Sequence, residues 1–431
     1  MLTAEQNQRL TQVDPGTEMG ELLRRYWYPV ATNHEIHHEP VKAVRLLGEN
    51  FTLFRDRSGR LGLIGQRCPH RNVNLKLGIP ENEGLRCPYH GWMFDVNGQC
   101  LEMPAESAKS TFANRVSIES HSVEEMGGLI WAYIGPRPAP LLPRWALFVR
   151  ENSMRQIGTT MLNCNWLQCQ ENSVDQVHAE YVHGHLGLYS MSQRGIDDPM
   201  MATRFKAMKR HHEQIGFDTF EYGIIKRRIR EGDEENPETW RVGHPLVFPN
   251  VVLIGRPALQ EFQIRVPVDE THTWHLVYEC YTPGEGVDVP VQDPVPSFEV
   301  PVEHLPVHVI GQDMIAWEEQ GAVTDRTNEK LTESDRGLIL YRKMLDEQAR
   351  IVAEGGDPIC TFRDPETNQS IELPMEEFAI TRYTPNDVYY NNSGHFSTAW
   401  REIDELVQQG ADRARERGEQ LGPPGFFDLP K

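Results

Sequence analysis

Two short loops, each carrying one cysteine and one histidine, constrain this chain more than any other feature of its sequence. The first loop reads Cys68-Pro-His70 and the second reads Cys87-Pro-Tyr-His90, with sixteen residues between them. Thiolate and imidazole are the soft and borderline ligands that transition metals select. The spacing therefore predicts a metal centre bound by four side chains, in a small domain that holds both loops.

Two kinds of metal centre are compatible with these loops. A structural zinc ion can take two cysteines and two histidines, but zinc sites usually pair cysteine with cysteine and histidine with histidine along the chain. A [2Fe–2S] centre with both cysteines on one iron and both histidines on the other takes one of each from each loop. The sequence favours this second centre, whose neutral histidine ligands would raise its reduction potential above that of an all-cysteine cluster.

Composition and charge disfavour several classes of protein. The 431 residues carry 63 acidic and 43 basic side chains, and the net charge of −20 disfavours both nucleic acid and an anionic membrane surface as partners. We find no transmembrane run and no secretory signal, so we expect a cytoplasmic protein. The odd number of cysteines, seven, indicates free thiols and metal ligands rather than a disulfide framework.

The hydrophobic pattern predicts three segments along the chain. Short β-rich runs separated by glycine and turn residues occupy 42–134, and a proline-rich stretch at 135–144 follows them. We therefore expect an N-terminal helical segment over 1–25, an all-β domain over 26–136 and a second domain over 137–431.

The second domain combines two patterns. Runs of alternating apolar and polar residues between 203 and 283 predict antiparallel strands, and 311–353 has a helical composition with few helix breakers. The predicted fold class is α+β, in which an all-β domain precedes an antiparallel sheet with helices segregated to one side.

A second metal constellation lies in this second domain. His178 and His183 are five residues apart in a stretch without proline. On an ideal α-helix such residues point about 140° away from each other, so they reach one metal ion only if the helix is locally distorted. With a carboxylate from elsewhere they would form the two-histidine, one-carboxylate arrangement that holds non-haem Fe(II) and leaves positions open for O₂ and substrate.

Together the two constellations resemble the Rieske non-haem iron aromatic ring-hydroxylating oxygenases. The pattern C-x-H-x16-C-x2-H resembles their Rieske [2Fe–2S] domain, and D-x2-H-x4-H, from Asp175 to His183, resembles their mononuclear iron motif. From LLRRYWYPVA at 22–31 to about residue 350 the chain is similar to the alpha (terminal oxygenase) subunits of the phthalate-dioxygenase type. The resemblance implies a helix-grip-like catalytic domain after the Rieske domain.

The resemblance also implies roles for individual residues. Cys68, His70, Cys87 and His90 would hold the [2Fe–2S] cluster. His178, His183 and Asp313 would hold the mononuclear Fe(II), because Asp313 stands near the start of a predicted helix, as the third ligand does in the family. Asp175 would be a catalytic bridging residue that orients an iron ligand of its own chain and accepts a hydrogen bond from a cluster histidine of a neighbouring subunit.

The resemblance further implies partners. Electrons from NADH would arrive through a separate reductase that carries flavin and a [2Fe–2S] cluster, and this chain has no G-x-G-x-x-G loop of its own for NADH. We expect a head-to-tail homotrimer, or a hexamer of identical alpha subunits, without a beta subunit.

The predicted reaction is hydroxylation of a small aromatic acid, phthalate-like or halobenzoate-like, with O₂. The residues around His178 differ from the small-residue version typical of phthalate dioxygenases, which keeps O-demethylation of a methoxylated aromatic acid as an alternative. A third hypothesis is a Rieske electron carrier without catalysis. Such a carrier, however, has no reason to keep the two histidines and the carboxylate of a second metal site. Arg241 and His244 are candidates to bind the substrate carboxylate, because arginine matches a carboxylate with paired donors.

Overall fold

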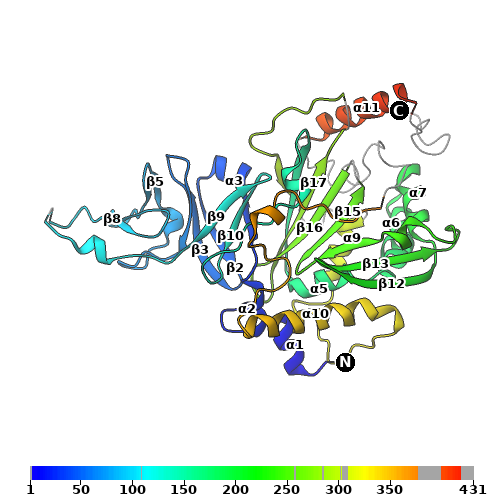
Figure 1. Cartoon of the computed structure of the whole chain (residues 1–431), viewed down its shortest axis with the longest axis horizontal. Coiled ribbons are helices and arrows are strands. Elements are labelled where there is room, and N and C mark those ends of the chain that lie inside the picture. Colours follow the sequence, from blue (N-terminus) through cyan, green and yellow to red (C-terminus); the bar gives the residue numbers. More distant parts are fainter. Residues whose placement is uncertain are drawn as a thin grey trace.

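The chain folds into two parts that are built around different sheets (Figure 1). The computed structural model describes residues 2–107, 109–256, 259–283, 286–300, 302, 309–376 and 399–418. The first part, blue to cyan in Figure 1, contains the cysteine–histidine loops, and the second part, green to red, contains the histidine pair. The predicted α+β class, an all-β domain followed by an α+β domain, is confirmed.

The first part contains two sheets. A six-stranded sheet has the order β1-β10-β9-β4-β3-β2 and consists of β1 (Tyr28–Thr32), β2 (Val41–Leu46), β3 (Glu49–Arg55), β4 (Leu61–Gly65), β9 (Ser120–Met126) and β10 (Leu129–Tyr133). A four-stranded sheet of short antiparallel strands consists of β5 (Ile79–Glu81), β6 (Gly84–Arg86), β7 (Met93–Phe94) and β8 (Cys100–Glu102). This smaller sheet lies at the end of the molecule away from the second part (Figure 1).

The second part is built on an eight-stranded sheet with the order β12-β13-β14-β15-β16-β17-β11-β18. Its strands are β11 (Met154–Leu162), β12 (His212–Phe220), β13 (Gly223–Arg230), β14 (His244–Val247), β15 (Val251–Arg256), β16 (Leu259–Pro267), β17 (Thr273–Tyr281) and β18 (Ser297–Glu299). The strands predicted between 203 and 283 are β12 to β17, and they pair antiparallel as expected. Strands β11 and β18 lie outside the predicted stretch, and the edge strand β18 pairs parallel with β11.

The two faces of this sheet differ in chemistry. Strand β16 is buried along its whole length. Phe262 and Ile264 belong to the apolar core on one face, and the alternate residues Glu261, Gln263 and Arg265 point to the other face because side chains alternate along a strand. A sheet therefore separates an apolar core from a buried polar layer.

Helices α5 (Trp166–Asn172) and α9 (Val309–Glu318) cover the polar face. The Arg265 guanidinium lies 5.4 Å from the centre of the Trp317 ring of α9, and the His275 ring lies 5.5 Å from it. On α5, the amide of Gln170 donates to the carbonyl of Val251 in β15. The space between these helices and the sheet is thus lined with polar groups.

The remaining helices lie around these sheets. They are α1 (Ala4–Thr11), α2 (Glu18–Leu23), α3 (Asn33–His38), α4 (Ala146–Val149), α6 (Leu186–Arg194), α7 (Pro199–Met208), α8 (Glu238–Arg241), α10 (Arg336–Ala353) and α11 (Trp400–Glu416). The helical stretch predicted at 311–353 is two helices, because Gly321 turns the chain after α9 with a φ of 88°, which a continuing helix does not allow. Within the described ranges, no helix combines the length and apolar character needed to cross a bilayer.

Candidate metal centres

The two cysteine–histidine loops have the same backbone conformation. In each loop the cysteine carbonyl accepts a hydrogen bond from the amide four residues later, Asn72 at 2.9 Å or Gly91 at 3.0 Å, and both of these residues are left-handed, with φ of 59° and 76°. Each cysteine amide in turn donates to the carbonyl five residues later, Val73 or Trp92. Asparagine and glycine tolerate left-handed backbone best, so these residues allow the loops to turn tightly around the cysteines.

The ligand side chains are arranged with cysteines inside and histidines outside. Cys68 and Cys87 are buried, whereas His70 is exposed and His90 is partly exposed. The two imidazole rings lie 4.5 Å apart, and the ring of Trp92 stacks on His70 at 4.4 Å. Burial and the neighbouring Cys87 thiol raise the pKa of Cys68 to about 11.

This arrangement fits a binuclear cluster better than one zinc ion. A tetrahedral zinc draws its ligand atoms to within about 4 Å of one another, since Zn–S and Zn–N bonds are about 2.0–2.3 Å. Among the described residues, the one group of three or more potential ligands whose atoms all lie within 4.8 Å of each other is in the other domain. The buried cysteines and the more exposed histidines fit a [2Fe–2S] cluster, which Cys68, His70, Cys87 and His90 would hold.

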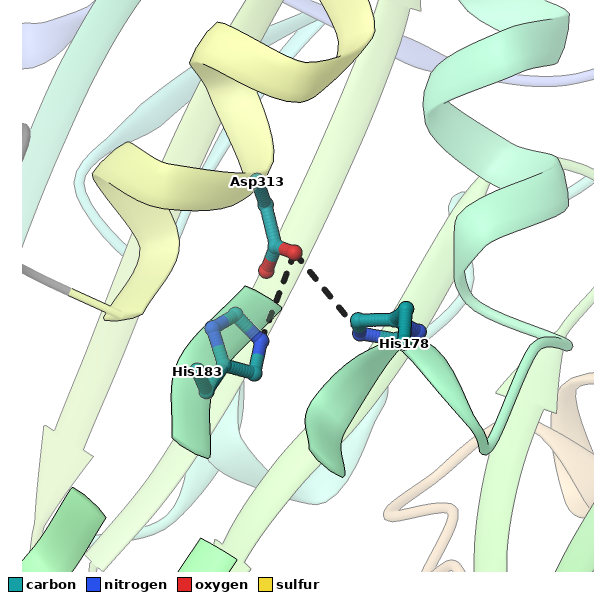
Figure 2. A group of neighbouring side chains, drawn as sticks. All are labelled: His178, His183 and Asp313. Carbon is teal, nitrogen blue, oxygen red and sulfur yellow. Dashed lines mark ion pairs between the residues drawn. The ribbon is translucent and has the colours of Figure 1, made fainter. Parts of the chain in front are cut away.

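That other group is His178, His183 and Asp313 (Figure 2). The Nε2 atoms of His178 and His183 lie 3.6 and 3.3 Å from Oδ1 of Asp313. The side chains come from two elements, because His178 directly precedes a π-helix, His183 lies within it, and Asp313 lies in α9. Two imidazoles and a carboxylate on one side of an ion are the donor set of non-haem iron.

The π-helix resolves the geometric problem of the histidine pair. It spans Ala179–His185, and its wider turn bonds residue i to residue i+5. His178 and His183 therefore come onto the same side of the helix instead of about 140° apart, and their ring centres are 5.2 Å apart. The distortion that the sequence required is present at the expected place.

Neighbouring side chains orient these ligands. Gln312 lies next to Asp313 in α9 and its Oε1 is 3.1 Å from Nδ1 of His183. The amide of Asn172, at the end of α5, is 3.4 Å from Oδ1 of Asp313. Such partners fix the tautomer and ring direction of a metal-binding histidine, which leaves Nε2 directed at the metal.

Asp175 contacts the histidine on its own chain. Its Oδ1 accepts hydrogen bonds from the amides of Val177 and His178, at 2.8 and 3.4 Å, and its Oδ2 lies 3.6 Å from Nδ1 of His178. The side chain keeps 31% of its surface exposed. Asp175 thus lies between an iron-site histidine and the molecular surface.

The electrostatics of the buried triad favour a charged carboxylate. Burial alone would lower the pKa of His183 and raise that of Asp313. Their mutual attraction reverses both effects, so the pKa of His183 is raised and that of Asp313 is lowered overall. Asp313 is therefore an anionic oxygen donor for a cation.

A buried ion-pair network holds the elements that carry the triad. Glu171 in α5 accepts from Arg326 Nη2 at 2.7 Å and from Arg342 Nε at 2.6 Å. All three residues are more than nine-tenths buried. Burial alone would raise the pKa of Glu171, but the two guanidinium groups hold it below its usual value. The network ties α5 to α10 and to the segment after α9.

The two candidate substrate residues have different positions. Arg241 lies in α8 with an exposed side chain, and its Nε donates to the carbonyl of Asn236, so the structure does not bring it to the triad. His244 begins β14 and its Nε2 lies 3.0 Å from Glu376, in a buried charged group. Sequence reasoning did not find Gln312, Asn172 or the residues around His244, because no local pattern marks them.

Comparisons with known proteins agree with this geometry. A family model described as the Rieske [2Fe-2S] domain matches residues 26–118. The chain is 39% identical over 382 residues to the 5,5'-dehydrodivanillate O-demethylase oxygenase subunit of Sphingobium sp. strain SYK-6, with 87% of each chain covered. It is 31% identical to the phthalate 4,5-dioxygenase oxygenase subunit of Pseudomonas putida, over 82% of this chain and 88% of that one.

A solved structure extends the agreement to the fold. The terminal oxygenase of carbazole 1,9a-dioxygenase from Novosphingobium sp. superposes with a TM-score of 0.57 at 20% identity, over 83% of this chain and all of that chain (100%). A Rieske domain followed by an α+β domain with a two-histidine, one-aspartate group defines an iron-dependent oxidoreductase. The chain belongs to the Rieske non-haem iron oxygenases, as an alpha (oxygenase) subunit. Its cofactors are a [2Fe–2S] cluster and a mononuclear non-haem iron, as predicted.

Proposed function

We propose that this terminal oxygenase demethylates a methoxylated aromatic acid in the cytoplasm, with O₂ and with electrons that a separate reductase takes from NADH. One methyl ether, O₂, NADH and a proton would give a phenol, formaldehyde, water and NAD⁺. The observation that carries an oxygenase function is the convergence of His178, His183 and Asp313 in a chain that also has the cysteine–histidine loops. The stronger similarity to an O-demethylase subunit favours this reaction over ring hydroxylation, which the sequence had placed first.

Ring hydroxylation of a phthalate-like or benzoate-like acid is the second candidate. It is supported by the similarity to a phthalate dioxygenase subunit and, at 32% identity, to the phenoxybenzoate dioxygenase alpha subunit of Ectopseudomonas oleovorans. The same donor set serves both reactions, and the outcome depends on which carbon the protein holds near the iron.

The residues of the two centres have separate roles in this proposal. Cys68, His70, Cys87 and His90 hold the cluster, and His178, His183 and Asp313 hold the iron. When bound, the cluster supplies electrons and the iron activates O₂. The chain's own contribution is to orient His183 through Gln312, to keep Asp313 ionised and to exclude water from the buried triad.

We also propose that electrons pass between subunits of a head-to-tail homotrimer, or of a hexamer made from two such rings, without a beta subunit. Within one chain, the cluster loops and the triad lie in different parts of the molecule (Figure 1). A ring closed by heterologous contacts brings the cluster of one subunit to the iron of the next. Asp175 would accept a hydrogen bond from His70 or His90 of the neighbour and orient His178 on its own side.

Exposed apolar side chains near both centres support such a contact. Leu77 and Tyr89, on the cluster side, keep 59% and 53% of their surface exposed. Tyr181 and Tyr189, in and just after the π-helix, keep 56% and 62% exposed. Large exposed apolar groups of this kind gather at protein–protein interfaces.

Iron analysis and product analysis test the proposed function. The purified protein should contain about three Fe per chain, two in the cluster and one at the triad. With a surrogate reductase and NADH, methoxybenzoates should consume O₂ and release formaldehyde, whereas benzoates and phthalates test ring hydroxylation. Uncoupled or absent turnover on every aromatic acid would contradict the proposal, and about two Fe per chain would support an electron carrier instead.

A further inference from the structure

The polar layer beneath the triad includes a group of charged residues on β13 and β14. Lys226 and His244 are paired in register on these neighbouring strands, and Arg228 follows Lys226 by two residues. Residues two apart in a strand point to the same side. The three side chains therefore share one face of the sheet.

Two of these three side chains have partners that balance them. Nε2 of His244 lies 3.0 Å from the carboxylate of Glu376, and Nδ1 of His244 lies 3.3 Å from Nη1 of Arg228. Arg228 also donates to Oε1 of Gln176 and approaches Glu376 at 4.0 Å. A neutral His244 can accept from Arg228, and the carboxylate of Glu376 lies close to both residues, so the opposite charges of Arg228 and Glu376 compensate one another.

Lys226 is the exception. It retains 9% of its surface, and its ammonium makes neither a hydrogen bond nor an ion pair with any residue that the structure describes. A largely buried ammonium without a counter-ion is strongly disfavoured. A charge kept at this cost inside an enzyme indicates that a ligand supplies the missing anion.

The hydrogen bond from Arg228 to Gln176, the residue after Asp175, brings this charged group near the iron-site residues. Burial and then Arg228 lower the pKa of Lys226 to about 8, and the carboxylates of Asp175 and Asp313 act on it in the opposite direction. Asp175 and Asp313 are the bridging residue and the iron ligand of the proposed function. The ammonium is therefore in the electrostatic field of the triad without forming an ion pair with it.

We infer that Lys226 binds an anionic oxygen of the aromatic substrate and so selects acids over neutral aromatics. This inference rests on the proposed function, since it takes the space at the triad to be the substrate site. The anionic oxygen is a carboxylate or a phenolate on the ring. Arg228 lies two residues from Lys226 on β13 and is held by Gln176 and Glu376. Its positive charge adds to the attraction of an anion at this position.

Substrate binding by matched variants tests this role. We compare the wild type with Lys226→Met, which keeps the length of the side chain without its charge, and Lys226→Arg, which keeps the charge. Lys343→Met, an exposed lysine of α10, is the control. Each oxygenase, loaded with both cofactors, is titrated calorimetrically without O₂ against veratrate, its methyl ester and guaiacol, and then assayed for turnover with a surrogate reductase.

We expect Lys226→Met to lose binding affinity for the charged probe and not for the neutral one. Lys226→Met should weaken veratrate binding at least about 30-fold while changing the affinity for the neutral ester by less than about threefold. KM should follow the affinity, kcat should change less, and iron content and the cluster spectrum should stay at wild-type values. Lys226→Arg should recover most of the loss, and Lys343→Met should bind like the wild type. If guaiacol rather than veratrate loses affinity, the bound oxygen is the phenolate.

Two results would overturn the inference. One is an equal loss for acid, ester and phenol, which would show a structural role, and the other is unchanged binding of all three. Both differ from failure of the proposed function, in which the wild-type enzyme itself turns over none of the aromatic probes.

Discussion

The two metal centres of this chain are built in opposite ways. The proposed cluster ligands lie on two loops that share two backbone hydrogen bonds, and all four fall within 23 consecutive residues, Cys68 to His90. The proposed iron ligands come from segments more than a hundred residues apart, and buried neighbours hold them in position. Local turn geometry suffices for the first centre, whereas the second depends on the packing of the whole catalytic domain.

The largest expected effects break one centre while sparing the other. Cys87→Ser should lose the visible spectrum of the cluster and about two Fe per chain, whereas Asp313→Ala should keep that spectrum and lose about one Fe. Both variants should lower turnover by more than about 10⁴-fold, because electrons and O₂ must meet at one site. Iron analysis, absorption spectra and O₂ uptake measure the three quantities. Loss of both metals in either variant would show that the centres depend on each other for assembly.

The contrast between a centre built from local loops and one built from distant segments explains how much of each site could be predicted from the sequence. Spacing alone identified the cluster loops, because their ligands and turn residues are neighbours in the chain. The histidine pair was recognisable, but helical periodicity argued against it, and only the π-helix brings His178 and His183 together. Asp313 required the family resemblance, since no local pattern separates it from other acidic residues of that helix.

Lys226 carried no signal at all in the sequence. In the run GIIKRRIR it looks like one of several exposed strand cations. Its burial follows from strand register and from the helices that cover the sheet, which are tertiary features. Sequence reasoning chose Arg241 and His244 in the same region, and the structure places only His244 beside Lys226.

A smaller loss is expected when the support of the iron site is weakened. Glu171→Gln removes the carboxylate that pairs with the buried Arg326 and one of the two that pair with Arg342, the other being Glu329, which should lower the free energy of unfolding of the catalytic domain by about 3–5 kcal/mol. Urea unfolding followed by circular dichroism measures this change, and the cluster absorbance reports on the Rieske domain. The cluster transition should move less than the catalytic one.

Glu354→Gln provides the control for that experiment. Its carboxylate pairs with Arg350 on the surface of α10, where both side chains are more than 60% exposed. Such a pair contributes less than about 0.5 kcal/mol. Equal destabilisation by both substitutions would contradict a special role for the buried network.

The link between the two centres is tested by Asp175→Asn. Asparagine can still accept the hydrogen bonds of the local turn, so both metal sites and the cluster spectrum should remain. The reductase should still reduce the cluster, but turnover should fall about 100-fold, because the carboxylate that we propose to link the two centres is lost. Rapid-mixing spectroscopy separates cluster reduction from cluster reoxidation. Near wild-type turnover, or an active protein that is a monomer in solution, would show that electrons do not pass between subunits.

The smallest effect concerns pH and reaches only the substrate side of the iron centre. Burial and the positive charges of Arg228 and Arg265 lower the pKa of Lys226 to about 8, against the opposing effect of Asp175 and Asp313. An anionic substrate binds the protonated form, so raising the pH through 8 removes the attraction. The KM for veratrate should rise about tenfold between pH 7 and 9 in the wild type, since the protonated fraction of Lys226 falls about tenfold over that range.

The KM of Lys226→Arg should stay nearly constant, because a guanidinium remains charged. The rate of cluster reduction should not share the wild-type profile, and a matching profile would place the titrating group on the electron path instead of the substrate site.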